Sequence, residues 1–226
     1  MKQVNGIYLP EYDTHFEKHL LKGPLFEGKG TYQYNKIEAA LKECKIRSVA
    51  LDIGAHVGLW SRVLCRHFAH VIAFEPVPIH RMCFDANLGE AANWKAGGNV
   101  CLHPDALGRD ERLIYINPTP GNSGNAHVDL MKMEGAELIE VQQRPLDYYQ
   151  LKNISFIKID VEGYELEVIK GGEQTIREQK PVMVVEQKPG NARKYGFKDT
   201  EAIILLQKWG ARVVWNMGGD YCLRFE

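Results

Sequence analysis

Two short apolar runs, at residues 48–53 and 70–74, flank a segment whose apolar residues recur with helical spacing. Apolar runs of this length are typical of strands that are buried on both faces of a parallel sheet. Between them, Trp60, Val63 and Phe68 fall on one face of a predicted helix. Strand, helix and strand in this order form a βαβ unit, whose crossover is right-handed in nearly all cases. The chain is therefore predicted to fold around a parallel sheet.

The same alternation continues beyond this unit. Further strands are predicted at residues 100–102, 154–160, 182–186, 212–215 and 221–225, with helices at about 79–88, from after 160 to about 178, and at about 200–209. Residues 113–116 and 138–141 predict a hairpin at the edge of the sheet, around a polar loop at 118–125. The predicted fold class is α/β: a Rossmann-like, doubly wound and mostly parallel sheet with an antiparallel C-terminal strand pair.

The 226 residues are expected to divide into a leader and one domain. Residues 1–30 show no clear periodicity, which predicts an irregular segment, and residues 34–45 have the spacing of a helix. We expect residues 1–45 to pack over the site, and residues 46–226 to form the Rossmann-like domain. A content of 45% hydrophobic residues allows one domain of this length to bury a sizeable core.

Charge and cysteine content exclude several function classes. Lysine and arginine number 28 against 29 acidic residues, so no global charge attracts nucleic acid or an anionic membrane. The 5 cysteines are scattered without a C-x-x-C pair, which argues against a zinc or redox site and for reduced thiols. No apolar run approaches the roughly 20 residues of a membrane helix. We expect a cytoplasmic protein that binds neither nucleic acid nor membrane.

Ligands of doubly wound sheets bind beyond the carboxyl ends of the strands. Five acidic residues fall at or just after predicted strand ends: Asp52, Glu75, Asp105, Asp160 and Glu186.

The turn after the first strand reads D-I-G-A-H-V-G over residues 52–58. Gly54 permits a sharp exit from the strand, and Gly58 lets the next helix approach closely, so that backbone N–H groups near Ala55 and His56 face a ligand. About twenty residues on, Glu75 and Pro76 end the second strand, where a carboxylate can accept the hydroxyl protons of a ribose. This arrangement predicts a nucleoside site.

The missing glycines indicate which nucleoside binds. A dinucleotide fingerprint would need glycine at the positions of His56 and Leu59. The negative charge of Asp52 disfavours a phosphate and suits an ammonium group. S-adenosyl-L-methionine has a ribose and an ammonium and no phosphate, so we expect it as the cofactor. A nicotinamide-dependent oxidoreductase is the alternative, because it shares the βαβ unit and Glu75.

The chain also resembles a known family. Its motifs at residues 52–58, 74–76, 106–108, 157–165 and 180–186, the most specific of which reads I-K-x-D-x-E-G-x-E, are similar to those of FkbM-type methyltransferases. The resemblance covers roughly residues 45–190. It implies a class I methyltransferase fold, S-adenosylmethionine as methyl donor and, usually, O-methylation of a hydroxyl on a sugar or natural product.

The resemblance also implies roles for single residues. Asp52, Gly54 and Gly58 would hold the methionine part, Glu75 would bind the ribose, and Asp105 with Ala106 would border the adenine. Asp160 and Glu162 would lie beside the transferring methyl group. His56 departs from the asparagine that the family commonly has there, although an imidazole can still donate one hydrogen bond.

Methyl transfer to oxygen needs an aligned hydroxyl and a group that removes its proton. Asp160 or Glu162 can be this base, or the two can hold a metal ion; Glu162 and Glu165 can also simply favour a helix N-terminus. Glu186 can bind substrate hydroxyls or a metal.

In the polar loop, Asn122 and Ser123 can bind a sugar or serve only as turn residues. The expected partner is a small-molecule or glycan acceptor. Binding of S-adenosylmethionine without catalysis remains an alternative. Nucleic-acid methylation also stays open, although the signature of base N-methyltransferases does not follow Asp160.

Overall fold

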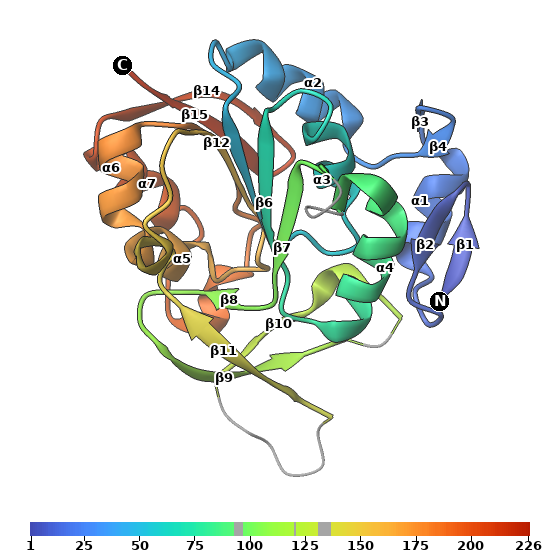
Figure 1. The fold of residues 1–226 in the computed structure, drawn as a ribbon. Helices are drawn as coiled ribbons and strands as arrows, with labels where there is room; N and C mark the ends of the chain where they lie inside the picture. The colour runs from blue at the N-terminus through green and yellow to red at the C-terminus, as the bar shows by residue number, and fades with distance from the viewer. Residues whose placement is uncertain (93–96, 120, 131–136) are drawn as a thin grey trace.

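The computed structural model describes residues 1–92, 97–119, 121–130 and 137–226, and within them the chain forms a central mostly parallel sheet (Figure 1). Its strand order is β14-β15-β13-β12-β5-β6-β7. The strands are β5 (Val49–Ile53), β6 (His70–Phe74), β7 (Val100–His103), β12 (Ile154–Ile159), β13 (Val182–Glu186), β14 (Ala211–Met217) and β15 (Asp220–Phe225). Only β15 runs antiparallel to its neighbours β13 and β14. The predicted α/β fold with an antiparallel C-terminal pair is confirmed.

Helices cover both faces of this sheet (Figure 1). They are α2 (Tyr34–Glu43), α3 (Leu59–Leu64), α4 (Pro78–Leu88), α5 (Glu165–Gly171), α6 (Glu173–Gln179) and α7 (Glu201–Lys208). Neighbouring strand residues point to opposite faces, so Ala50 packs with α2, α3 and α4, whereas Leu51 packs with α5, α6 and α7. Short 3₁₀ helices lie at Gly89–Ala92, Ser123–Asn125, Leu146–Tyr149 and Ala192–Tyr195. None of the helices in the described ranges is long and apolar enough to cross a membrane.

One predicted helix, ending near residue 178, is two helices. The helix is interrupted at Gly171, the last residue of α5, and Gly172, which precedes α6. A β-carbon on Gly171 would lie 1.9 Å from the carbonyl oxygen of Gly108, so the backbone passes too closely there for any larger residue.

The predicted edge hairpin is instead a separate sheet. Its strands are β8 (Ala106–Leu107), β9 (Arg112–Asn117), β10 (His127–Asp129) and β11 (Ile139–Arg144), in the order β10-β9-β11-β8. The predicted pairing of β9 with β11 is present, with Ile116 opposite Ile139. The sheet buries Ile114 and Val128 against Val77, and therefore has its own core. Residue 120 of the predicted polar loop lies outside the described ranges.

The prediction of an irregular segment over residues 1–30 is wrong. This part forms β1 (Lys2–Val4), β2 (Ile7–Leu9), α1 (His15–Lys22), β3 (Leu25–Phe26) and β4 (Lys29–Gly30). The strands are too short to show a period, but Asn5 and Gly6 between β1 and β2 both have positive φ, as the common two-residue hairpin turn requires. Ile7 and Leu20 are buried in a cluster that includes Val57 of the first turn, so the leader packs on that turn.

Candidate functional site

Two cavities open at the carboxyl edge of the parallel strands, beside the point between β5 and β12 where the strand order reverses. One, the Glu75 cavity, is bordered by Glu75, Pro76, Asp105, Ala106 and Tyr164 among others. The other, the Glu186 cavity, is bordered by Phe16, Tyr32, Trp60, Glu186 and Lys188 among others. Both share the residues Gly54, His56, Gly124, Asp160 and Glu162. The two cavities are therefore adjacent parts of one site.

Glu75 is the buried acid of the first cavity. Its Oε2 accepts the N–H of His56 at 2.8 Å, and its Oε1 accepts the N–H of Val77 at 2.9 Å and faces Nδ1 of His80 at 3.2 Å. Burial opposes the charge of Glu75, but the imidazole of His80 and the N–H donors outweigh it and lower the pKa of the carboxyl. A carboxylate has about four acceptor positions. Three are in use, so one remains for a hydroxyl in the cavity.

The glycines of the first turn are required by close contacts. A β-carbon on Gly54 would lie 1.9 Å from the carbonyl oxygen of Asp160, and one on Gly58 would lie 2.5 Å from Leu88 of α4. Both residues also have positive φ. The N–H groups of Gly54 and Ala55 both donate to the carbonyl of Phe74. These donors are already paired, contrary to the expectation that they face a ligand.

Asp52 borders neither cavity. It is fully buried, accepts a hydrogen bond from Ser61 Oγ at 2.7 Å and lies 3.4 Å from Nζ of Lys158. The structure therefore does not bring this carboxylate to a position where it contacts a ligand, although the sequence predicted that it would.

Lys158 connects these parts and was missed in the sequence. Its Nζ donates to the carbonyl of Gly54 at 2.8 Å and lies 3.4 Å from Asp52 and 3.7 Å from Asp160. Burial opposes the ammonium, but Asp52 and Asp160 outweigh it, so the pKa of Lys158 is raised. The signal was a lysine inside an apolar strand, in register with Asp52 on the neighbouring strand.

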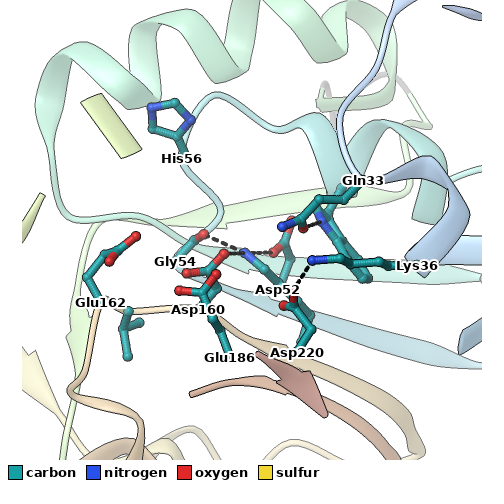
Figure 2. A network of polar contacts seen from close by, with 12 residues as sticks. Gln33, Lys36, Asp52, Gly54, His56, Asp160, Glu162, Glu186 and Asp220 are labelled. Carbon is teal, nitrogen blue, oxygen red and sulfur yellow. Dashed lines mark hydrogen bonds and ion pairs between the residues drawn. The ribbon is translucent and has the colours of Figure 1, made fainter. Parts of the chain in front are cut away.

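Asp160, Glu162 and Glu186 come together, as predicted. Oxygen atoms of the three carboxylates lie within 4.8 Å of one another. In Figure 2 they gather on one side of Gly54, and the ring of His56 lies apart from them. Three carboxylate oxygens at this spacing are a donor set suited to Mg²⁺ or a similar hard cation.

A strained turn brings Glu162 to this group. Its φ is +54°, which is uncommon for a residue other than glycine. The carboxylate of buried Glu165 accepts the N–H groups of Val161 and Gly163 at 3.2 and 2.9 Å, and Asn191 donates to Glu162 at 2.8 Å. Glu165 therefore supports the turn that presents Glu162, and it does more than favour a helix N-terminus.

Crowding and burial raise the proton affinity of two of these carboxylates, Glu162 and Glu186. Burial and the neighbouring charge of Asp160 raise the pKa of Glu162 to about 7 and that of Glu186 to about 10. Lys188 lies 2.8 Å from Glu186 and 3.8 Å from Glu162, and opposes both shifts. Burial and crowding therefore favour the protonated forms of both carboxyls, and Lys188 favours their ionised forms.

The polar loop contributes to both cavities. Asn122 borders the Glu186 cavity, and fully buried Ser123 borders the Glu75 cavity. The N–H of Ser123 donates to Asp13 at 2.9 Å, and its Oγ lies 2.7 Å from Nε2 of His56. Asp13, in the leader, had no recognisable signal in the sequence.

Comparisons with known proteins agree on one kind of protein. A family model described as the methyltransferase FkbM domain matches residues 52–213. Hexuronic acid methyltransferase AglP of Haloferax volcanii is 30% identical over 142 residues, which are 60% of this chain and 54% of that protein. Methyltransferase sdnD of Sordaria araneosa is 28% identical, over 60% of this chain and 64% of that protein. The chain thus spans less than two thirds of either relative.

A solved structure shows the same fold. The crystal structure of methyltransferase FkbM from Methylobacillus flagellatus KT aligns with a TM-score of 0.51 and 21% identity, over 80% of this chain and 44% of that one.

Proposed function

The chain belongs to the FkbM family of methyltransferases, whose methyl donor is S-adenosylmethionine, and we propose that it methylates a hydroxyl oxygen on a sugar, glycan or natural-product acceptor. The observation that carries this proposal is the pair of adjacent cavities. One is bordered by an acid placed for a ribose, the other by three carboxylates, and they meet at Asp160 and Glu162. Family membership decides against the nicotinamide-dependent oxidoreductase.

The Glu75 cavity receives the adenosine part of the cofactor. Glu75 accepts a ribose hydroxyl at its remaining acceptor position, beside Pro76. Asp105 and Ala106 border the adenine, and Tyr149 Oη donates to Asp105 at 2.5 Å and fixes that carboxylate. Gly54, which borders both cavities, would hold the methionine part. Asp52 contributes through Lys158, which holds the carbonyl of Gly54.

The Glu186 cavity receives the acceptor. Methyl transfer is an in-line displacement, so the attacking oxygen has to lie on the far side of the methyl group from the sulfur. Asp160 borders both cavities and takes the proton of this hydroxyl. Glu162 and Glu186 bind further polar groups of the acceptor.

The walls of the Glu186 cavity support a sugar-like acceptor. Phe16, Tyr32 and Trp60 border it. Phe16 and Trp60 are buried and Tyr32 is partly exposed, so Tyr32 is the ring that can pack against the apolar face of a sugar. Phe16 and Tyr32 come from the leader, which therefore forms part of the acceptor site. That one relative is named a hexuronic acid methyltransferase is consistent with this class.

The test is a screen of sugars, sugar nucleotides and glycosides with isotope-labelled S-adenosylmethionine, read by mass spectrometry. Asp160→Asn keeps the size of the side chain and removes its charge. We expect this variant to fold and to bind the cofactor, while turnover falls by about 10²–10⁴-fold, the range for loss of general-base assistance. Near-normal turnover would show that Asp160 has only a structural role.

The same assay separates a direct base from a metal site. If the three carboxylates hold a cation that activates the hydroxyl, chelation abolishes turnover of the wild type and Mg²⁺ restores it. If Asp160 acts alone, chelation changes nothing. Glu162→Gln is expected to reduce turnover less than Asp160→Asn, because Glu162 orients the acceptor.

A further inference from the structure

A chain of hydrogen bonds joins the leader to the first turn. The carboxylate of Asp13, which is fully buried, accepts the N–H of Phe16 at 2.7 Å. It also accepts both the N–H of Ser123, at 2.9 Å, and the hydroxyl of Ser123, at 2.5 Å. The same hydroxyl oxygen lies 2.7 Å from Nε2 of His56. Residues from three separate segments thus meet at one imidazole.

The chain fixes which nitrogen of His56 carries the proton. An ionised carboxylate only accepts hydrogen bonds, so the single hydroxyl proton of Ser123 points to Asp13. The oxygen of Ser123 can then only accept from His56, which requires the proton to be on Nε2. Nδ1 is left as a hydrogen-bond acceptor, and it forms no hydrogen bond within the described ranges. Burial and the neighbouring His80 lower the pKa of His56, which keeps the ring neutral.

The position of the ring is also fixed. Its centroid lies 4.8 Å from that of Phe16 and 4.5 Å from that of His80, the latter in an edge-on contact. The backbone of His56 has φ of +51°, and its N–H is held by Glu75. A strained residue held this firmly at a cavity is typical of a functional position.

The ring of His56 lies where the two cavities meet. Nε2 points to Ser123, which borders only the Glu75 cavity, whereas Phe16 on another side of the ring borders only the Glu186 cavity. The ring itself borders both. Nδ1 lies on a different edge of the ring from Nε2 and therefore does not point to Ser123.

We propose that His56 determines acceptor specificity: its Nδ1 accepts a hydrogen bond from a hydroxyl of the acceptor other than the one that is methylated. Asp13 and Ser123 are positioning residues that keep this nitrogen unprotonated. The proposal rests on the proposed function and adds that the acceptor carries at least two hydroxyls, one at Asp160 and one at His56. A pyranoside ring meets this requirement.

The first test needs no acceptor. Long-range ¹H–¹⁵N NMR of histidine-labelled protein reports the protonation of each ring nitrogen, and the His56 signals are assigned by their loss in His56→Leu. We expect Nε2 to be protonated and Nδ1 to be unprotonated in the wild type, and a mixture of tautomers in Ser123→Ala. A wild-type ring protonated at Nδ1 overturns the proposal.

The second test measures discrimination. The probes are the methyl pyranosides of glucose, galactose, mannose and glucuronic acid, each with its monodeoxy analogues. For the pyranoside that is methylated, we expect loss of one non-reacting hydroxyl to lower kcat/KM of the wild type by about 2- to 13-fold, the effect of one neutral hydrogen bond. In His56→Leu the ratio of kcat/KM for the pyranoside to kcat/KM for its deoxy analogue falls to about 1, because the leucine accepts no hydrogen bond. His67→Leu, in the turn that follows α3, is the matched control and keeps the wild-type ratio of kcat/KM.

The outcomes separate the two proposals. If His56→Leu keeps the wild-type ratio of kcat/KM between the pyranoside and its deoxy analogue, with or without weaker cofactor binding, His56 does not bind the acceptor. If other hydroxyl compounds are methylated and none of these pyranosides is, the acceptor class is wrong while the proposed function stands. If the protein binds S-adenosylmethionine and methylates nothing in either panel, the proposed function itself fails.

Discussion

Glu75→Gln tests how one carboxylate serves both the fold and the cofactor. In the wild type each oxygen of Glu75 accepts a backbone N–H, from His56 on one side and Val77 on the other. The amide of glutamine replaces one oxygen with an NH₂ group. Whichever way it is oriented, one of the two N–H groups loses its acceptor and meets another donor.

The magnitudes follow from these contacts. A buried N–H without an acceptor costs about 1–3 kcal/mol, which for a chain of this length lowers Tm by about 2–12 °C. Loss of the charge also weakens the hydrogen bond to the ribose. A charge-assisted hydrogen bond contributes about 1.5–3 kcal/mol, so the Kd for S-adenosylmethionine is expected to rise by about 10- to 150-fold.

The assays are differential scanning fluorimetry without cofactor and titration calorimetry with it, at a temperature where both proteins are folded. Glu90→Gln, on an exposed 3₁₀ turn after α4, is the matched control and should change neither value. A variant at Glu75 that keeps the wild-type Kd would refute the assignment of this cavity to the cofactor. One that loses affinity with an unchanged Tm would refute the structural role of the carboxylate.

Three further predictions address the support of the site. Burial raises the pKa of Glu165 from its ordinary 4.5 to about 7, so folding takes up a proton and the free energy of unfolding falls as pH rises between those values. In Glu165→Gln, we expect the free energy of unfolding to fall by roughly 3 kcal/mol less than in the wild type between pH 5 and pH 8, as measured by urea unfolding. Lys158→Met leaves the buried carboxylate of Asp52 without its partner and should lower the free energy of unfolding by about 3–5 kcal/mol in the same assay. Lys152→Met removes an exposed ion pair and should lower it by less than about 1 kcal/mol. Gly54→Ala should abolish cofactor binding in calorimetry, because its β-carbon would lie 1.9 Å from a backbone oxygen. Gly210→Ala is the control: Gly210 has positive φ and open space around it, so this variant should lose only about 1 kcal/mol of stability and keep the affinity for the cofactor.

The sequence determined the architecture and the family. Buried parallel strands are continuous apolar runs, and each carries its own signal, so the runs at residues 48–53 and 182–186 were located within a residue or two. The strand-end acids were found for the same reason, because a charged residue is costly inside such a strand. Bringing Asp160 and Glu186 together followed from topology alone, since parallel strands end at one edge, whereas Glu162 also needs the turn that Glu165 supports.

The tertiary structure decided what each of these acids does. Asp52 and Asp160 look alike in the sequence, yet Asp52 is enclosed by Ser61 and Lys158, while Asp160 borders both cavities. Most of the leader showed no periodicity because its strands are two or three residues long, whereas α1 buries Phe16 and Leu20 at helical spacing. The order of the leader depends on burial against the first turn. Asp13 lies 110 residues from its partner Ser123, a separation over which no local pattern applies. Local periodicity records which face of an element is buried, whereas the partner of a buried charge is set by contacts between distant segments, and only the folded chain brings those together.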